Sequence, residues 1–123
     1  MALIADVVFD AAITVLTTNT NVLYITSTEA ATYAEASSTK KLGTKSSYSL
    51  GAVGNGTPSG RKTTAPAISD GVVNTTGSAS HWALCSGTVL YATGALSAPQ
   101  GVTSGNTFTL TAFDVTIIDA VSA

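Results

Sequence analysis

The chain has 123 residues, enough for one domain, and its 45% content of hydrophobic residues argues against global disorder. Only 10% of the residues are charged and the net charge is −2, so we do not expect nucleic acid, which needs clustered basic residues, as a partner. The 21 threonines and 14 serines are the main polar groups, and this composition favours β structure.

Residues 3–16 are the first segment with a clear period, and we predict an amphipathic helix there. Asp6, Asp10 and Thr14 are spaced by four residues and form one polar stripe, which we expect to face water or polar partners. A strand is the alternative, because valine and isoleucine favour β structure, but the stripe favours the helix. We expect the wide apolar face of this helix to be buried; it consists of Val7, Val8, Ala11, Ala12, Val15 and Leu16.

The segment from Val22 to Ser27 alternates and predicts a strand. Its side chains divide into two sets, with Leu23 and Ile25 on one face and Tyr24 and Thr26 on the other.

Weaker signals follow this strand. Thr28 is expected to cap a short helical turn that runs through Ala36. Residues 37–47 are rich in serine, threonine and lysine and hold three of the five basic side chains. Tyr48 and Leu50 are expected to begin a short strand.

Residues 51–60 contain four glycines and one proline, which predicts a long exposed loop or an arm ordered by a partner. The segment lacks the Gly-Lys-Ser/Thr ending of a phosphate-binding loop, so we prefer the flexible arm. We expect assembly contacts in and just after this segment, made by Gly54, Asn55, Gly56, Arg61 and Lys62.

Residues 61–69 predict a strand that is interrupted at Pro66, because proline cannot donate to a β ladder. Proline in a strand indicates an edge or a bulge. We therefore expect a sheet edge or a bulge at this position.

Residues 79–118 are the most regular β region of the chain. Strands are predicted at 80–85 and 88–93, joined by a tight turn at Ser86-Gly87. A looped connection is predicted from Gly94 to Gly105, followed by a strand from Thr107 whose alternation changes phase near Ala112-Phe113, as at a bulge or a new strand.

These short strands, with no internal repeat and no linker, predict a single domain over residues 1–123. The expected fold is mainly β: an antiparallel β-sandwich or open barrel with one N-terminal amphipathic helix. We expect Trp82 to anchor its core, with a contact at an interface as the alternative.

The sequence shows no catalytic or metal-binding arrangement, and we predict a protein that is not an enzyme and has no cofactor. His81 and Cys85 are the only residues of their types, and on one strand they would lie about 13 Å apart, too far to share a metal ion. His81 could be combined with Asp70 or Asp114 and one of the 14 serines into a Ser/His/Asp triad, but with so many serines such a combination has no weight. The sequence also lacks a Gly-x-Ser-x-Gly elbow.

The N-terminal sequence lacks the basic start of a signal peptide, and no apolar run approaches the ~18 residues that span a bilayer. We therefore expect synthesis in the cytoplasm and no contact with a membrane. One cysteine excludes an internal disulfide.

Three motifs stand out in the second half of the chain: His81-Trp82-Ala83-Leu84, Ala92-Thr93-Gly94-Ala95-Leu96 and Gly105-Asn106-Thr107-Phe108-Thr109-Leu110. With the opening Met1 to Asp6 and the segment Thr32 to Ala36, they resemble small virion proteins of tailed bacteriophages. The resemblance covers about two-thirds of the chain. The resemblance implies no catalytic residues.

Four functional hypotheses follow. The resemblance and the low charge favour a virion structural protein, first of all a capsid decoration (cement) protein that contacts the major capsid protein and its own copies, for example as a trimer. A tail tube, adaptor or fibre subunit is the alternative. A carbohydrate- or ligand-binding β-sandwich would use a stacking surface of Tyr24, Tyr33, Tyr48 or Tyr91. An enzyme is the least supported.

Overall fold

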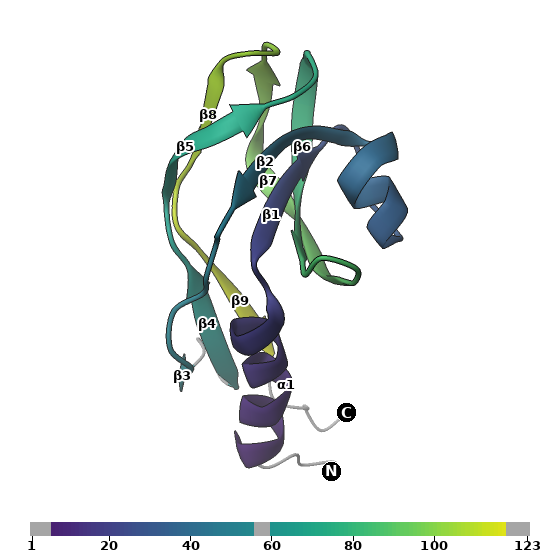
Figure 1. Cartoon of the computed structure of the whole chain (residues 1–123). Helices are drawn as coiled ribbons and strands as arrows, with labels where there is room; N and C mark the ends of the chain where they lie inside the picture. The colour runs from purple at the N-terminus through teal and green to yellow at the C-terminus, as the bar shows by residue number, and fades with distance from the viewer. Residues whose placement is uncertain (1–5, 56–59, 118–123) are drawn as a thin grey trace, which may run out of the picture.

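The computed structural model describes residues 6–55 and 60–117 and is mainly β with one N-terminal helix, which confirms the predicted fold class (Figure 1). The helical elements are α1 (Asp6–Asn19) and a short π-helical turn, η1 (Glu35–Thr39). The strands are β1 (Val22–Thr26), β2 (Lys41–Ser46), β3 (Gly54–Asn55), β4 (Arg61–Ala65), β5 (Ile68–Val73), β6 (Gly77–Cys85), β7 (Leu90–Val102), β8 (Thr107–Leu110) and β9 (Phe113–Ile117).

The strands form two antiparallel sheets. The larger sheet has the order β7-β6-β1-β2-β5-β8 and curves into a half-barrel, so the open barrel is the observed form of the predicted fold (Figure 1). The smaller sheet has the order β3-β4-β9. β7 and β8 are therefore the two edge strands of the half-barrel.

The two sheets share one bent ribbon of paired strands. Ala65 pairs with Phe113 in the small sheet, and Ile68 pairs with Leu110 in the large sheet. Ala65 and Ile68 are three residues apart, and so are Phe113 and Leu110. The pairing therefore keeps the same register across the bend. The bend lies at Pro66, which confirms the predicted interruption, but β4 and β5 are inner strands of their sheets, so an edge position is wrong. The phase change near Ala112 is the start of a new strand.

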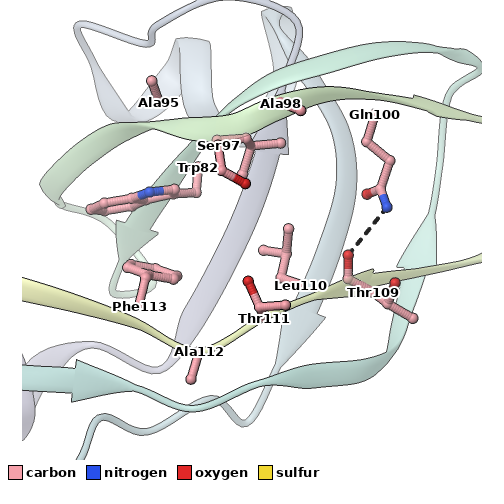
Figure 2. Close-up of a pocket in the computed structure, with 11 residues that line it drawn as sticks. Trp82, Ala95, Ser97, Ala98, Gln100, Thr109, Leu110, Thr111, Ala112 and Phe113 are labelled. Atoms are coloured by element: carbon pink, nitrogen blue, oxygen red, sulfur yellow. Dashed lines mark hydrogen bonds between the residues drawn. The ribbon is translucent and has the colours of Figure 1, made fainter.

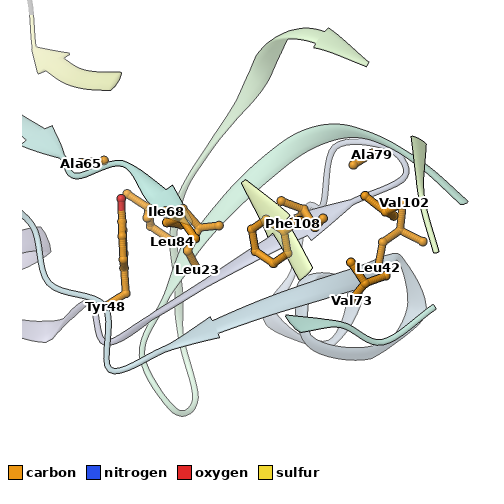
Figure 3. Close-up of a cluster of buried hydrophobic side chains, with 11 residues drawn as sticks. Leu23, Leu42, Tyr48, Ala65, Ile68, Val73, Ala79, Leu84, Val102 and Phe108 are labelled. Carbon is orange, nitrogen blue, oxygen red and sulfur yellow. The ribbon is translucent and has the colours of Figure 1, made fainter. Parts of the chain in front are cut away.

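The main core lies inside the half-barrel (Figure 3). Leu23 and Ile25 of β1 are completely buried in it, which confirms the predicted alternation. Tyr24 points to the other side, into a smaller cluster that residues 30–36 cover. β1 is thus buried on both faces, as expected for a strand in the middle of the sheet. Burying one large apolar side chain stabilises a fold by roughly 1.5–3 kcal/mol.

The helix forms as predicted, but its buried face differs from the predicted one. Phe9 and Ile13 are buried, four residues apart on one side of α1. Val7, Val8 and Val15, which were expected inside, are 71%, 55% and 47% exposed. α1 also continues to Asn19 rather than ending at 16, and residues 3–5 of the predicted helix lie outside the described residues.

An ion pair explains why the predicted face was wrong. Asp10, a member of the polar stripe, lies on the inner side of α1 because Arg61 of β4 supplies a partner for its carboxylate. Arg61 lies 51 residues further along the chain, so helical periodicity alone gives no sign of this contact. The side of the helix that carries Val7, Val8 and Val15 is left facing solvent.

The connection predicted from Gly94 to Gly105 is wrong over most of its length, because β7 continues to Val102. Only residues 103–106 form a turn, in which Gly105 has a positive φ of 90°. Gly94 and Pro99 are signals for a loop, but an edge strand accommodates both residues.

Two smaller predictions are also wrong. Thr32, not Thr28, caps the helical turn, since its Oγ1 accepts a hydrogen bond from the Glu35 amide (3.2 Å). Tyr48 does not begin a strand. Its ring fills the main core and its hydroxyl donates a hydrogen bond to the carbonyl oxygen of Pro66 (2.7 Å).

Candidate functional site

The half-barrel is open between its two edge strands. β7 and β8 follow each other in the chain, yet among the described residues β7 pairs only with β6 and β8 only with β5. The gap holds a cavity of about 570 Å³, a volume typical of ligand-binding pockets (Figure 2). We call it the seam slot; its walls are residues 95–98 and Gln100 on one side and residues 109–113 on the other, with Trp82 at one end.

Irregular backbone forms both walls of the seam slot. Ala79 pairs with Gln100 and His81 pairs with Ala95. One residue of β6 therefore faces four residues of β7 between these two pairs. β7 therefore bulges away from β6 over residues 96–99. In the opposite wall, residues 111 and 112 lie between β8 and β9 and belong to neither ladder.

Each end of the seam slot is closed by a contact between its walls. At one end, Nε2 of Gln100 donates a hydrogen bond to the carbonyl oxygen of Thr109 (3.3 Å; Figure 2). At the other, the rings of Trp82 and Phe113 are stacked, with centroids 4.5 Å apart and an interplanar angle of 29°. Oε1 of Gln100 is buried and has no hydrogen-bond partner among the described residues.

The lining of the seam slot carries no charged side chain. It combines apolar groups such as Leu96 and Leu110 with the hydroxyls of Ser97 and Thr111. Removing a charged group from water is costly without a partner of opposite charge, so the seam slot suits an uncharged occupant. Comparison of the chain with protein-family models, with curated proteins and with solved structures gives no match.

Trp82 lies at the edge of the main core rather than at its centre. It is half-buried and packs against that core from the end of the seam slot that its stack with Phe113 closes. Both faces of its indole are covered: Figure 2 shows the ring between the β7 ribbon and Phe113, and a Cβ on Gly94 of β7 would lie 2.4 Å from its Cζ2 atom. Trp82 therefore presents its edge, not a ring face, to the seam slot.

The predicted arm is partly a β-hairpin. Gly54 pairs with Lys62 and Asn55 pairs with Arg61, which joins β3 to β4. Gly51 is also fixed, because its amide donates to the carbonyl oxygen of Thr64 (2.8 Å). Within the described residues 51–55, the loop is thus held by the small sheet, whereas Gly56 lies outside the described residues.

Both basic residues of this hairpin make ion pairs within the molecule. Arg61 contacts Asp10 through Nε (2.6 Å) and hydrogen-bonds Asn55 through Nη1. Nζ of Lys62 lies 2.9 Å from Oδ2 of Asp114, and hydrogen bonds from Lys62 and then from Thr64 lower the pKa of that carboxyl. The structure gives these residues a role in holding α1 and β9, and their role in assembly stays a prediction.

His81 and Cys85 lie on β6, as expected, and neither belongs to a catalytic arrangement of the described residues. Ser80 has one hydroxyl hydrogen, and it donates this to the carbonyl oxygen of Ser27 (2.7 Å). Nδ1 of His81 lies 2.7 Å from the same hydroxyl and is the donor to it in the tautomer that keeps both hydrogen bonds. Burial raises the pKa of the Cys85 thiol to about 11, which keeps it protonated at neutral pH.

Other predicted groups are dispersed. Tyr24 and Tyr48 are buried in two different clusters, so their rings do not form a shared stacking surface. In residues 6–55 and 60–117, no three His, Cys, Asp or Glu side chains are placed to hold a metal ion. No helix in the described part of the chain has the length and apolarity that a membrane crossing requires.

The seam slot was not predicted from the sequence. Pro99 and Gly101 follow closely on Ser97 and Ala98, and we interpreted this run as a loop. A proline inside an edge strand beside a bulge gives the same pattern. The one usable signal was Gln100, a long amide side chain among small residues.

Proposed function

We propose that this chain is a structural subunit of a tailed-phage virion, and that it acts as a capsid decoration protein. The observation that supports this proposal is the solvent-facing side of α1. Val7, Val8 and Val15 are all about half or more exposed there, and Ala11 and Ala12 beside them are exposed as well. Contiguous exposed apolar surface on a helix is typical of a protein interface.

The orientation of α1 makes this surface available for docking. The ion pair between Asp10 and Arg61 and the burial of Phe9 hold the opposite side of the helix on the small sheet. The valine side is therefore a fixed face that is ordered before a partner binds, which lowers the entropic cost of association.

The low charge of the chain supports the same proposal. With 10% charged residues, the protein has few groups that would be desolvated without a partner in an interface. A decoration protein binds at many equivalent sites of a shell, so a modest gain at each site adds up over the lattice. The resemblance of residues 79–84, 90–96 and 102–110 to small virion proteins is the reason for proposing this class of assembly.

Binding to bare capsids of the same phage tests the proposal. We expect the purified protein to bind at a fixed copy number and to raise the temperature at which the capsids break. Val8→Lys should abolish binding, because it places a charge in the docked face. Val72→Lys is the matched control, since Val72 on β5 is exposed to the same extent (54% against 55%) but lies on another surface.

Equal binding by the two variants would contradict docking through α1. No binding to capsids, with recovery of the protein in purified tails, would contradict the decoration role and indicate a tail subunit.

A further inference from the structure

We propose that the seam slot binds an extended, uncharged segment of another protein chain, which adds as a strand to the open edge of the half-barrel. This inference goes beyond the docking of α1 and does not depend on it. It concerns a different surface, formed by β7, β8 and the residues that follow β8.

The first argument is the unpaired backbone along both walls. Residues 96–99 have no ladder partner on β6, and residues 111 and 112 have none on β5 or β4. The outer edges of β7 and β8 face the same gap, and in the described residues one side-chain hydrogen bond, from Gln100 to Thr109, connects them there. Unpaired edges are templates for the backbone of another chain.

The second argument is the buried acceptor at the closed end of the seam slot. Within residues 6–55 and 60–117, Oε1 of Gln100 is buried and has no donor, and a buried unpaired polar atom destabilises a fold by roughly 1–3 kcal/mol. An amide N–H of an added strand is a donor of the right kind once the side chain of Gln100 turns towards the gap. A purely apolar ligand offers this acceptor no donor.

The third argument is charge and size. The lining holds no charged residue, so lysine or glutamate side chains of a ligand would lose water without gaining a partner. From Ala95 to Gln100 the wall has six residues, which span about 16 Å at the usual rise of a strand. A segment of about five residues with small apolar and hydroxyl side chains matches both properties.

A carbohydrate fits the seam slot less well. Sugars bind by stacking on a free aromatic face, and both faces of Trp82 are covered, by Gly94 and by Phe113. The aromatic groups of the slot therefore act as walls, not as a platform.

Titration of the isotope-labelled protein with capped pentapeptides tests the proposal. The probe is Ser-Val-Thr-Val-Ser, compared with the same peptide N-methylated at both valines and with a peptide that has lysine at both valine positions. We expect amide resonances of Ser97, Ala98 and Thr111 to move with the first peptide only, and the emission of Trp82 to change with them. Those of Asn55, in the small sheet, should stay unchanged.

Gln100→Leu removes the acceptor at nearly constant size and should weaken binding of the first peptide about fivefold. Gly101→Ala is the control, because a Cβ there meets no atom within 4 Å, and it should bind as the unchanged protein does. Unfolding midpoints of both variants verify that they are folded.

Several results would overturn the proposal. One is the absence of any shift up to about 5 mM peptide, a range that covers millimolar affinities. Another is equal binding of the N-methylated peptide, which would show that backbone pairing is not used. A third is movement of the same resonances with maltotriose but not with the peptide. None of these results would affect the capsid-binding test, which uses a different surface.

Discussion

Nε of Arg61 lies 2.6 Å from Oδ1 of Asp10, and this ion pair connects β4 to a helix 51 residues earlier in the chain. The side chain of Arg61 is only 20% exposed, so the pair is partly shielded from water. Asp10 and Phe9 together determine which side of α1 packs on the small sheet and which side faces solvent. The docking face of the proposed decoration protein is thus set by a contact with the small sheet.

Asp10→Asn should destabilise the protein by about 1 kcal/mol, because it leaves the shielded guanidinium of Arg61 without a counter-charge. Urea unfolding at pH 7 measures the change. Asp70→Asn is the control: its pair with Lys45 has a similar separation (3.0 Å), but Asp70 is 70% exposed, and such pairs contribute roughly 0–1 kcal/mol. A larger effect at Asp70 would contradict the role given to the Asp10 pair.

Gly71→Ala should destabilise the protein by about 1–3 kcal/mol, the range expected for overpacking a core. A Cβ at this position would lie 2.2 Å from Cε1 of Phe108, whose ring is buried across the strand. Thermal unfolding measures the loss. Gly101→Ala, in the same sheet and in open space, should be neutral or slightly stabilising. A neutral Gly71→Ala would show that the ring of Phe108 does not pack directly on Gly71.

The protein should lose stability in alkali. Burial raises the pKa of Cys85 to about 11, above the value of about 8.5 in an unfolded chain. Between these values the unfolded state gives up its proton first, so stability is complete below about pH 8.5 and falls as the pH rises towards 11. Unfolding by urea should show a decrease of about 1–2 kcal/mol from pH 8 to pH 10.

Cys85→Ala should remove most of that decrease. Burial also raises the pKa of Tyr48 to about 12, but that phenol contributes mainly above pH 10. If the variant and the unchanged protein lost the same stability between pH 8 and pH 10, Cys85 would not be the group responsible.

Phe113→Leu should shift the fluorescence of Trp82 to longer wavelength, because it uncovers one face of the only tryptophan in the chain. The stacked pair closes one end of the seam slot, so the smaller side chain admits water there. The emission maximum of the folded protein measures the change. Tyr91→Leu, on β7 at a distance from the pair in sequence, should leave the maximum in place. Identical spectra for both variants would contradict the stacked arrangement.

Local pattern was sufficient to predict much of this fold. The alternation of Leu23 with Tyr24 was correct, since the two faces of that strand pack into different clusters and its own sequence distinguishes them. Pro66 marked the bend for the same local reason, because it cannot donate to a ladder.

The errors arose where a distant residue decides the outcome. The predicted apolar face of α1 meets solvent because the pair of Asp10 with Arg61 holds the other side of the helix on the small sheet. Gly94 belongs to a strand because the indole of Trp82 occupies the place of its side chain. The seam slot depends on four residues of β7 facing one residue of β6, a mismatch that cannot be seen in either strand alone.

The common register of the bent ribbon has a consequence for how the chain folds. β4 pairs with β9 and β5 pairs with β8, and the register of Ala65 with Phe113 is kept at Ile68 with Leu110 before it shifts between Ile68 and Gly71. A slip by one residue in the small sheet would turn every side chain of β4 and β9 to the wrong face and break the register across the bend. We therefore expect β6 and β7 to form early as a local hairpin and the ribbon to close late, in one step that completes both sheets together.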